Sequence, residues 1–165
     1  MDALVRIFVT ALLVCCFSSF YSCSSEDVST IEELNTENSV FYVKIEDDVI
    51  HLINEYRMSK NLSPLEKLNL ISMEAKEHTE YMISENEVNH DYFADREYNL
   101  RKSVNAVMVG ENVGYGYHTA KGVVDAWIKS DSHRENIEGD YTTTGISAMQ
   151  NKKGDYFYTH IFVKR

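Results

Sequence analysis

The stretch around Glu111 and Asn112 is the first candidate for chemistry. It holds one carboxylate and one amide among three glycines, Gly110, Gly114 and Gly116. Because glycine permits close backbone approach and positive φ angles, we expect Glu111 and Asn112 to lie on a glycine-rich turn. The pattern is only a weak match to a phosphate-binding loop, since it lacks the P-loop lysine and Glu111 would repel a phosphate.

A second polar group follows an apolar helical stretch and consists of Ser130, Asp131 and His133. Two imidazoles and one carboxylate can hold a divalent metal, with water completing the shell. If His90 and His133 converge on Glu111, these side chains form a site for Zn or Mg. The alternative is a polar network in which Glu111 accepts hydrogen bonds and fixes the loops.

Other enzyme classes share residue types with these segments but lack the defining patterns. Ser130, His133 and Glu111 are the types of a nucleophilic triad, yet the chain has no Gly-x-Ser-x-Gly elbow. His133-Arg134-Glu135 resembles the His-x-Glu of zinc deaminases, which also need a later pair of cysteines. All three cysteines of this chain lie within its first 23 residues.

Three histidines of this chain are interpreted from their positions in predicted elements. His78 lies on the apolar face of a predicted helix, where we expect a bond to a backbone carbonyl. His90 lies in a predicted loop, where it either joins a site or is held by Asp91. His160 lies on a predicted strand that is bulky on both faces, and it is interpreted as structural.

Hydrophobic periodicity predicts the elements that position these residues. Apolar side chains at helical spacing predict three helices, at about residues 45–61, 65–85 and 120–128, and residues 98–104 form a short amphipathic piece. Thr119 is the expected N-cap of the last helix, and Trp127 is expected in the core. Strand-like runs at 145–149 and 156–163 predict a C-terminal hairpin, whose second strand is central and covered on both sides.

The N-terminal residues resemble an export signal. An almost wholly apolar run over residues 7–17 follows Arg6, and its length suits a signal peptide over residues 1–22. Phe20-Tyr21-Ser22-Cys23 resembles a bacterial lipobox, so Cys23 is the expected lipidation site, with ordinary secretion as the alternative. Residues 23–44 are rich in Ser, Thr and acidic residues and are expected to be a tether. The folded domain is expected to cover residues 45–165.

Composition limits the partners. The chain of 165 residues has a net charge of −10, which argues against nucleic acid, because phosphate binding needs clustered Lys and Arg. The same charge argues against electrostatic adhesion to anionic lipid, so the expected membrane contact is the N-terminal lipid. An apolar fraction of 44% is enough for a sizeable core.

An ordered set of short motifs covers about residues 47–163. The motifs are Ala75-x-x-His78-x-x-x-Met82, Asn89-His90 with Phe93, Gly110-Glu111-Asn112-Val113, Val124-x-x-Trp127-x-x-Ser130-x-x-His133-Arg134-x-Asn136-Ile137, Gly145-Ile146 and Tyr158-Thr159-x-x-Phe162. In this order they resemble the CAP family, also called the SCP domain, and most closely its bacterial branch without disulfides. The resemblance implies an α+β fold, a three-layer α-β-α sandwich with a central antiparallel sheet and a cleft.

The resemblance also implies site residues. Better-known members of the family bring two histidines and two acidic residues together in the cleft. By motif, the first histidine looks like His90 and the first acid like Glu111. Ser130 stands where the second acid is expected, with Asp131 as a stand-in.

The second histidine of the better-known members is also replaced, because Phe157 stands in its place. The bacterial branch resembles this chain in carrying His133 instead. Some family members bind a divalent metal in the cleft, and others bind lipids or sterols.

Two functions follow as hypotheses, and the sequence leaves open whether the protein is an enzyme. The first is an exported, membrane-tethered module that binds a lipid, a glycan or a protein at the cell surface. Its cleft would be formed by His90, Glu111, His133, Ser130, Asp131 and Asn112. The second is a hydrolase that uses the same cleft and depends on a divalent metal.

Overall fold

The computed structural model describes residues 44–165. A helix covers residues 44–59 of this part of the chain. The elements that follow are β1 (Glu66–Lys67), α2 (Asn69–Glu85), α3 (Phe93–Ser103), β2 (Met108–Tyr115), α4 (Ala120–Lys129), α5 (Asp131–Glu138), β3 (Thr143–Gln150) and β4 (Tyr156–Lys164). None of the helices in this part is long and apolar enough to cross a membrane. The predicted signal peptide, Cys23 and nearly all of the predicted tether lie outside the described residues.

β4 lies inside a four-stranded sheet of order β1-β3-β4-β2. It pairs antiparallel with β3 on one side and with β2 on the other, and only the short β1 adds in parallel. The connection from β3 to β4 turns at Gly154, whose φ of +86° favours glycine. The predicted hairpin and its central second strand are therefore confirmed.

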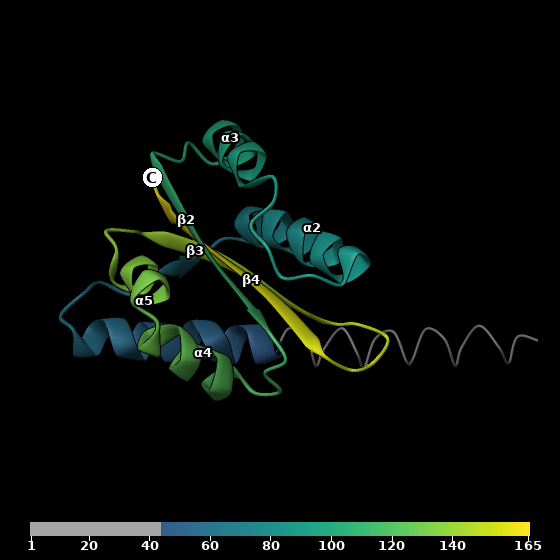
Figure 1. The fold of residues 1–165 in the computed structure, drawn as a ribbon. Coiled ribbons are helices and arrows are strands. Elements are labelled where there is room, and N and C mark those ends of the chain that lie inside the picture. The colour runs from purple at the N-terminus through teal and green to yellow at the C-terminus, as the bar shows by residue number, and fades with distance from the viewer. Residues whose placement is uncertain (1–43) are drawn as a thin grey trace, which may run out of the picture.

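The sheet separates two layers of helices (Figure 1). α2 and α3 cover one face, where Ile161 and Val163 of β4 pack against Ile71 and Leu100. The helix at 44–59, α4 and α5 cover the other face, and their side chains pack with alternate residues of β4, namely Tyr156, Tyr158 and Phe162. Both faces of β4 are therefore buried, and the predicted α-β-α sandwich is confirmed.

α4 begins and packs as its sequence predicts. The Thr119 hydroxyl accepts a hydrogen bond from the Gly122 amide at 3.1 Å, which caps the helix. Trp127 is only 2% exposed, and its indole N–H donates to the Val113 carbonyl at 2.8 Å. A buried tryptophan needs such a partner, so Trp127 both fills the core and fixes α4 against β2.

Arg57 holds α5 in place from the helix at 44–59. Its guanidinium is buried and donates to the carbonyls of Ile137, Gly139 and Tyr141, at 2.7, 2.9 and 3.2 Å. The last carbonyls of a helix lack partners within the helix. Arg57 supplies a donor to the Ile137 carbonyl in the last turn of α5 and to two carbonyls just after the helix. Burial lowers the pKa of Arg57.

Two predicted segments have different bounds in the structure. The helix expected from residue 65 begins at Asn69, because Glu66 and Lys67 pair with Thr143 and Thr144 of β3. The amphipathic piece at 98–104 belongs to α3, a helix that begins earlier, at Phe93. The earlier start places Arg96 on the first turns of α3.

The glycine-rich turn expected around Glu111 is wrong, because the segment forms the strand β2. Its glycines permit close packing rather than a turn. A Cβ at Gly110 would collide with the Tyr141 hydroxyl, and a Cβ at Gly114 would lie 3.0 Å from Val123. Glu111 therefore lies on a strand that is closely packed against Tyr141 and Val123 at its glycines.

Candidate functional site

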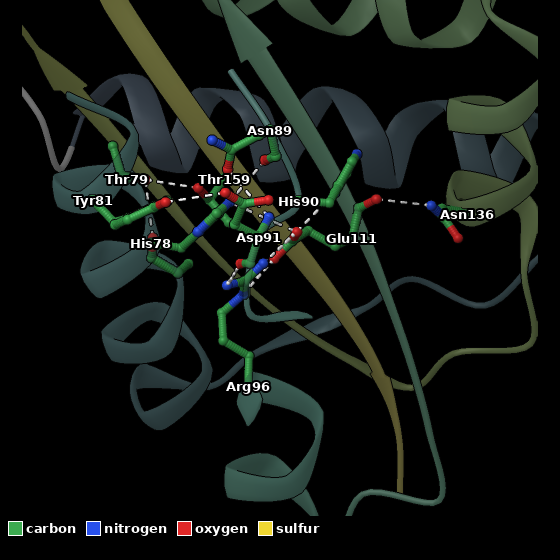
Figure 2. Close-up of polar contacts among 11 residues, drawn as sticks. His78, Thr79, Tyr81, Asn89, His90, Asp91, Arg96, Glu111, Asn136 and Thr159 are labelled. Carbon is green, nitrogen blue, oxygen red and sulfur yellow. Dashed lines mark hydrogen bonds and ion pairs between the residues drawn. The ribbon is translucent and has the colours of Figure 1, made fainter. Parts of the chain in front are cut away.

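The carboxylate of Glu111 is the centre of a buried polar network (Figure 2). Its side chain is 1% exposed. Arg96 donates to it through two nitrogens, Nε to Oε2 at 2.8 Å and Nη2 to Oε1 at 2.7 Å. His90 Nδ1 lies 2.8 Å from the same Oε1. Such a bidentate pair is among the strongest hydrogen-bonded arrangements in proteins.

Arg96 also fixes the loop that carries His90. Its Nη1 donates to the Asp91 carbonyl at 2.6 Å. The loop enters α3 through Tyr92, whose φ of +58° is rare for a residue with a side chain. The Asp91 side chain accepts from the Tyr81 hydroxyl at 3.0 Å. His90 is therefore held by Glu111, and not by Asp91 as the alternative interpretation proposed.

His78 of α2 closes the buried side of this network. Its Nε2 lies 2.9 Å from the Asn89 carbonyl, to which it donates, and 3.9 Å from Glu111 Oε1. Burial lowers the pKa of His78 despite the hydrogen bond and the nearby carboxylate, which favours the neutral ring. The predicted bond to a backbone carbonyl is confirmed.

Glu111 keeps its charge in this environment. Burial alone would raise its pKa, but the hydrogen bonds from His90 and Arg96 and the charge of Arg96 outweigh burial. The pKa of Glu111 is lowered as a result. At neutral pH the network contains one carboxylate and one guanidinium, which are in direct contact and shielded from solvent.

Asn112 faces the opposite side of β2 and ties the strand to α5. Its amide donates to the His133 carbonyl at 3.0 Å. Asn136 of α5 donates to the Glu111 carbonyl at 3.0 Å and to the Asn112 side chain at 2.9 Å. The strand that carries Glu111 is thus fixed by the side chains of Glu111 and Asn112, one toward each layer of helices.

Ser130, Asp131 and His133 form a separate group at the start of α5. His133 Nδ1 lies 2.9 Å from the Ser130 hydroxyl, and the Asp131 side chain is 93% exposed and pairs with Arg134. Burial is the main cause that lowers the pKa of His133, and the nearby His90 lowers it further. The structure brings His90 to Glu111 but places the side chains of the α5 group in contacts of their own.

His160 is fully buried on β4. Its Nε2 lies 2.7 Å from the Thr144 hydroxyl, and its ring stacks on Trp127 at 5.7 Å. Burial lowers the pKa of His160 to about 3. The complete burial of His160 favours the interpretation of this residue as structural.

A cleft of about 280 Å³ opens along the edge of β2. It is lined by Val109, Gly110 and Glu111 of β2, which we call its floor, and by His90, Phe93 and Asn136, which we call its walls. Phe93 begins α3 and Asn136 lies on α5, and these helices cover opposite faces of the sheet (Figure 1). The His90 side chain is 51% exposed. His90 and Asn136 are the polar side chains that a ligand in this cleft would meet first.

The residues of the expected metal site do not fit a metal as they stand. Both oxygens of Glu111 are bonded to Arg96, so a guanidinium lies where a cation would need the carboxylate. Within residues 44–165, no group of three or more His, Cys, Asp or Glu side chains is arranged to hold a metal. Binding of Zn or Mg by His90, His133 and Glu111 stays a prediction.

Sequence reasoning misses Arg96, which lies outside the predicted amphipathic piece at 98–104 and pairs with Glu111 across 15 residues. Phe93 and Asn136 belong to the motifs of the family resemblance, but the sequence indicates no role for either. One signal in the sequence could have found Arg96. A carboxylate that becomes buried needs a cation as its partner, and Arg96 lies between the two motifs that carry His90 and Glu111.

Solved structures of three bacterial proteins share this fold. An outer surface protein of Borrelia burgdorferi matches with a TM-score of 0.64 and 23% identity, over 70% of this chain and 89% of that chain. An extracellular protein with an SCP domain from Bacillus anthracis matches with a TM-score of 0.70 and 20% identity, over 79% and 43%. A cysteine-rich secretory protein of Staphylococcus aureus matches with a TM-score of 0.65 and 21% identity, over 75% and 39%.

The sequence comparisons identify the family. The uncharacterized protein YkwD of Bacillus subtilis (strain 168) is 28% identical over 134 residues, which are 78% of this chain and 52% of YkwD. The chain thus spans about half the length of this curated relative. The family model of the cysteine-rich secretory protein family, CAP, matches residues 50–163. This match runs from before β1 almost to the end of β4, and the chain belongs to the CAP family.

Proposed function

We propose that this protein is an exported ligand-binding module whose binding site is the cleft at the edge of β2. The observation that carries the proposal is that the cleft walls are fixed before any ligand arrives. His90 is held by Glu111, and Asn136 is held by the main chain of Glu111 and the side chain of Asn112. Fixed walls favour binding, because little conformational entropy is lost when the ligand enters.

The expected export is supported by the apolar run at residues 7–17 and by the proteins with a similar fold, two of which are named as outer-surface or extracellular. Lipidation at Cys23 would tether the domain to a membrane through residues 23–44. Labelling with a radioactive fatty acid in a bacterial host tests this, with Cys23→Ala as the variant that should lose the label. Label retained in Cys23→Ala would contradict tethering at this residue.

The binding function is tested by comparing the wild-type protein with His90→Ala on arrays of glycans, lipids and peptides. His90→Ala removes a cleft wall that is half exposed. The matched control is His51→Ala, because the His51 side chain is 72% exposed on the helix at 44–59, where it pairs with Glu55 on the surface. We expect a ligand that binds the wild type and His51→Ala but not His90→Ala. If no ligand shows this pattern, the proposed function is wrong.

The metal-dependent hydrolase remains the alternative hypothesis. It requires that Glu111 exchange Arg96 for a divalent cation. Calorimetric titration with zinc and with magnesium tests this in the wild type, His133→Ala and Glu111→Gln. Metal binding that both substitutions abolish would favour the hydrolase, and metal binding that neither changes would exclude the predicted ligands.

A further inference from the structure

The edge of β2 that faces the cleft has main-chain groups without partners. β2 is the last strand of the sheet order, so one of its two hydrogen-bonding edges faces no strand. The Gly116 amide donates to the Tyr156 carbonyl at 2.9 Å, which continues the β2–β4 ladder. Because main-chain groups alternate along a strand, those of Val109, Glu111 and Val113 point away from β4.

Two of these outward carbonyls are capped and the rest of the edge is open. Trp127 donates to the Val113 carbonyl and Asn136 to the Glu111 carbonyl. The Val109 N–H and C=O and the Glu111 N–H bond to no other residue in the described range 44–165. The open groups belong to residues that form the floor of the cleft.

The shape of the cleft selects what can pair with this edge. His90 and Phe93 stand on one side of the open groups and Asn136 on the other. A second copy of the chain would bring its own β2 edge with the same walls, so the two recessed edges could not meet. A single extended peptide has no such walls. It can enter the cleft and bond to the Val109 N–H, the Val109 C=O and the Glu111 N–H.

The surroundings of the open edge add charge and apolar surface. Arg101 and Lys102 end α3 just before β2. Arg101 pairs with Glu97 and also donates to the carbonyls of Ala106 and Val107, at 3.3 and 3.1 Å. Lys164 lies on the β4 side of Met108 and pairs with Asp140, so the cations beside the open edge are Arg101 and Lys102, in a chain of net charge −10. Next to this edge, Val107 is 65% and Met108 is 36% exposed.

We propose that the ligand of this cleft is an extended peptide, acidic at one end, which adds as a strand to the open part of the β2 edge. This inference rests on the proposed function and names its ligand class. In such strand addition the main chain supplies the hydrogen bonds and the side chains supply the selectivity. The acidic end of the peptide lies near Met108, and its apolar side chains contact Val107 and Phe93.

The first test uses synthetic peptides and the full chain labelled with ¹⁵N. The probe is an acetylated and amidated octapeptide of alternating threonine and valine, with two glutamates added at one end. Two controls carry N-methyl groups on either the threonines or the valines, and a third replaces the glutamates with lysines. We expect the probe to shift the amide signals of Val109 and Glu111. One N-methylated form should bind at least about tenfold more weakly than the other, because only one set of peptide N–H groups faces β2.

The second test removes one main-chain donor from the protein. Val109→Pro deletes the outward N–H, and proline is tolerated on an edge strand where the N–H faces away from the ladder. Val109→Thr keeps the donor and is the control. We expect Val109→Pro to bind the octapeptide at least about tenfold more weakly than Val109→Thr. If Val109→Pro does not fold, the pair of N-methylated peptides decides the question.

The outcomes separate this inference from the proposed function. Equal binding of both N-methylated peptides, or no amide shift at about 1 mM octapeptide, would overturn strand addition. If the arrays then give a glycan or lipid whose binding needs His90, the cleft still binds a ligand and only the peptide class is wrong. If the arrays give no ligand that depends on His90, both proposals fail. Tighter binding of the lysine peptide than of the glutamate peptide would overturn the inferred charge.

Discussion

The two edges of the sheet are each fixed by a glutamate, but the two glutamates have different surroundings. At the β3 edge, Glu46 accepts a hydrogen bond from the Ala148 amide at 2.9 Å, and burial raises its pKa to about 7. At the β2 edge, Glu111 is paired with Arg96, and its pKa is lowered. A buried carboxylate thus remains charged at neutral pH where a guanidinium touches it, and binds its proton more strongly where none does.

The two edges also differ in how completely they are closed. β1 covers the start of the β3 edge, the Ser72 hydroxyl accepts from the Ile146 amide at 3.3 Å, and Glu46 covers Ala148. On β2, side chains cover Glu111 and Val113 but not Val109. Open sheet edges invite pairing with other chains, and proteins usually cover them. The part left open here is the floor of the cleft, which is why we assign it a binding role.

The largest expected effect comes from breaking the charged pair at the β2 edge. Arg96→Met leaves the Glu111 carboxylate buried without its cation. Removal of one partner of a buried ion pair costs about 3–5 kcal/mol of the free energy of unfolding. Urea unfolding followed by circular dichroism measures the loss. The control is Arg101→Met, because Arg101 lies on the same helix but is exposed.

A second substitution checks the cause of this loss. Adding Glu111→Gln to Arg96→Met removes the unpaired charge, so the double variant should be more stable than Arg96→Met alone. A double variant that is less stable by the sum of both single losses would show that the two side chains act independently, contrary to their contact.

The β3 edge should respond to pH in the opposite direction to the β2 edge. The pKa of Glu46 is about 7 in the folded protein and 4.5 as its ordinary value. Its stabilising contribution is therefore complete below pH 4.5 and is lost as the pH rises through about 7. Relative to wild type, Glu46→Gln should gain about 3 kcal/mol between pH 4 and pH 8, because one pKa unit corresponds to about 1.4 kcal/mol. Asp48→Asn, on an exposed side chain of the same helix, is the control.

Urea unfolding at five pH values across this range measures the effect of Glu46. A difference between Glu46→Gln and wild type that stays constant with pH would contradict the raised pKa. Glu111→Gln should show the reverse trend below pH 4.5, so its series extends to more acidic buffers. The lowered pKa of Glu111 stabilises the folded protein above pH 4.5, and this stabilisation is lost as the pH falls through the lowered pKa.

A smaller effect is expected from opening the β2 edge further. Asn136→Leu removes the donor that caps the Glu111 carbonyl and bonds to Asn112. Leaving partly buried groups without partners should cost about 1–3 kcal/mol. Hydrogen exchange should also accelerate at the amides of β2 but not at those of β3. The matched control is Asn99→Leu, because the Asn99 side-chain amide on α3 makes an exposed contact with Glu74 at 3.3 Å. Equal loss of stability in both variants would show that the cap has no special role.

The sequence predicts the parts of this molecule that depend on neighbouring residues in the chain. The faces of the helix at 44–59 and of α4 follow from helical spacing, and the burial of β4 follows from bulky residues on both of its sides. Tertiary contacts decide the rest. Gly110 and Gly114 resemble turn residues until Tyr141 and Val123 are placed against them.

The candidate site was predictable only in part, for the same reason. His90 and Glu111 belong to motifs, and their contact was expected from the family resemblance. Arg96 has no periodic signal, because its partner is chosen by how α3 packs onto the sheet. The two-residue strand β1 has none either, since it is defined by pairing with β3. The glycines also hid that this segment is a strand, in which Glu111 and Asn112 face opposite layers of helices.

The smallest expected effect sharpens the difference between the two edges. Ser72→Ala uncaps the Ile146 amide on β3, where the bond is 3.3 Å long and partly buried. Its loss should cost only about 0.5–1.5 kcal/mol, and the cleft on the opposite edge should keep its ligand. We therefore expect Ser72→Ala to bind the octapeptide as wild type does, whereas Val109→Pro loses it. If Ser72→Ala weakened binding as much as Val109→Pro, the two edges would be coupled through the sheet, and the open groups of β2 would not by themselves account for binding.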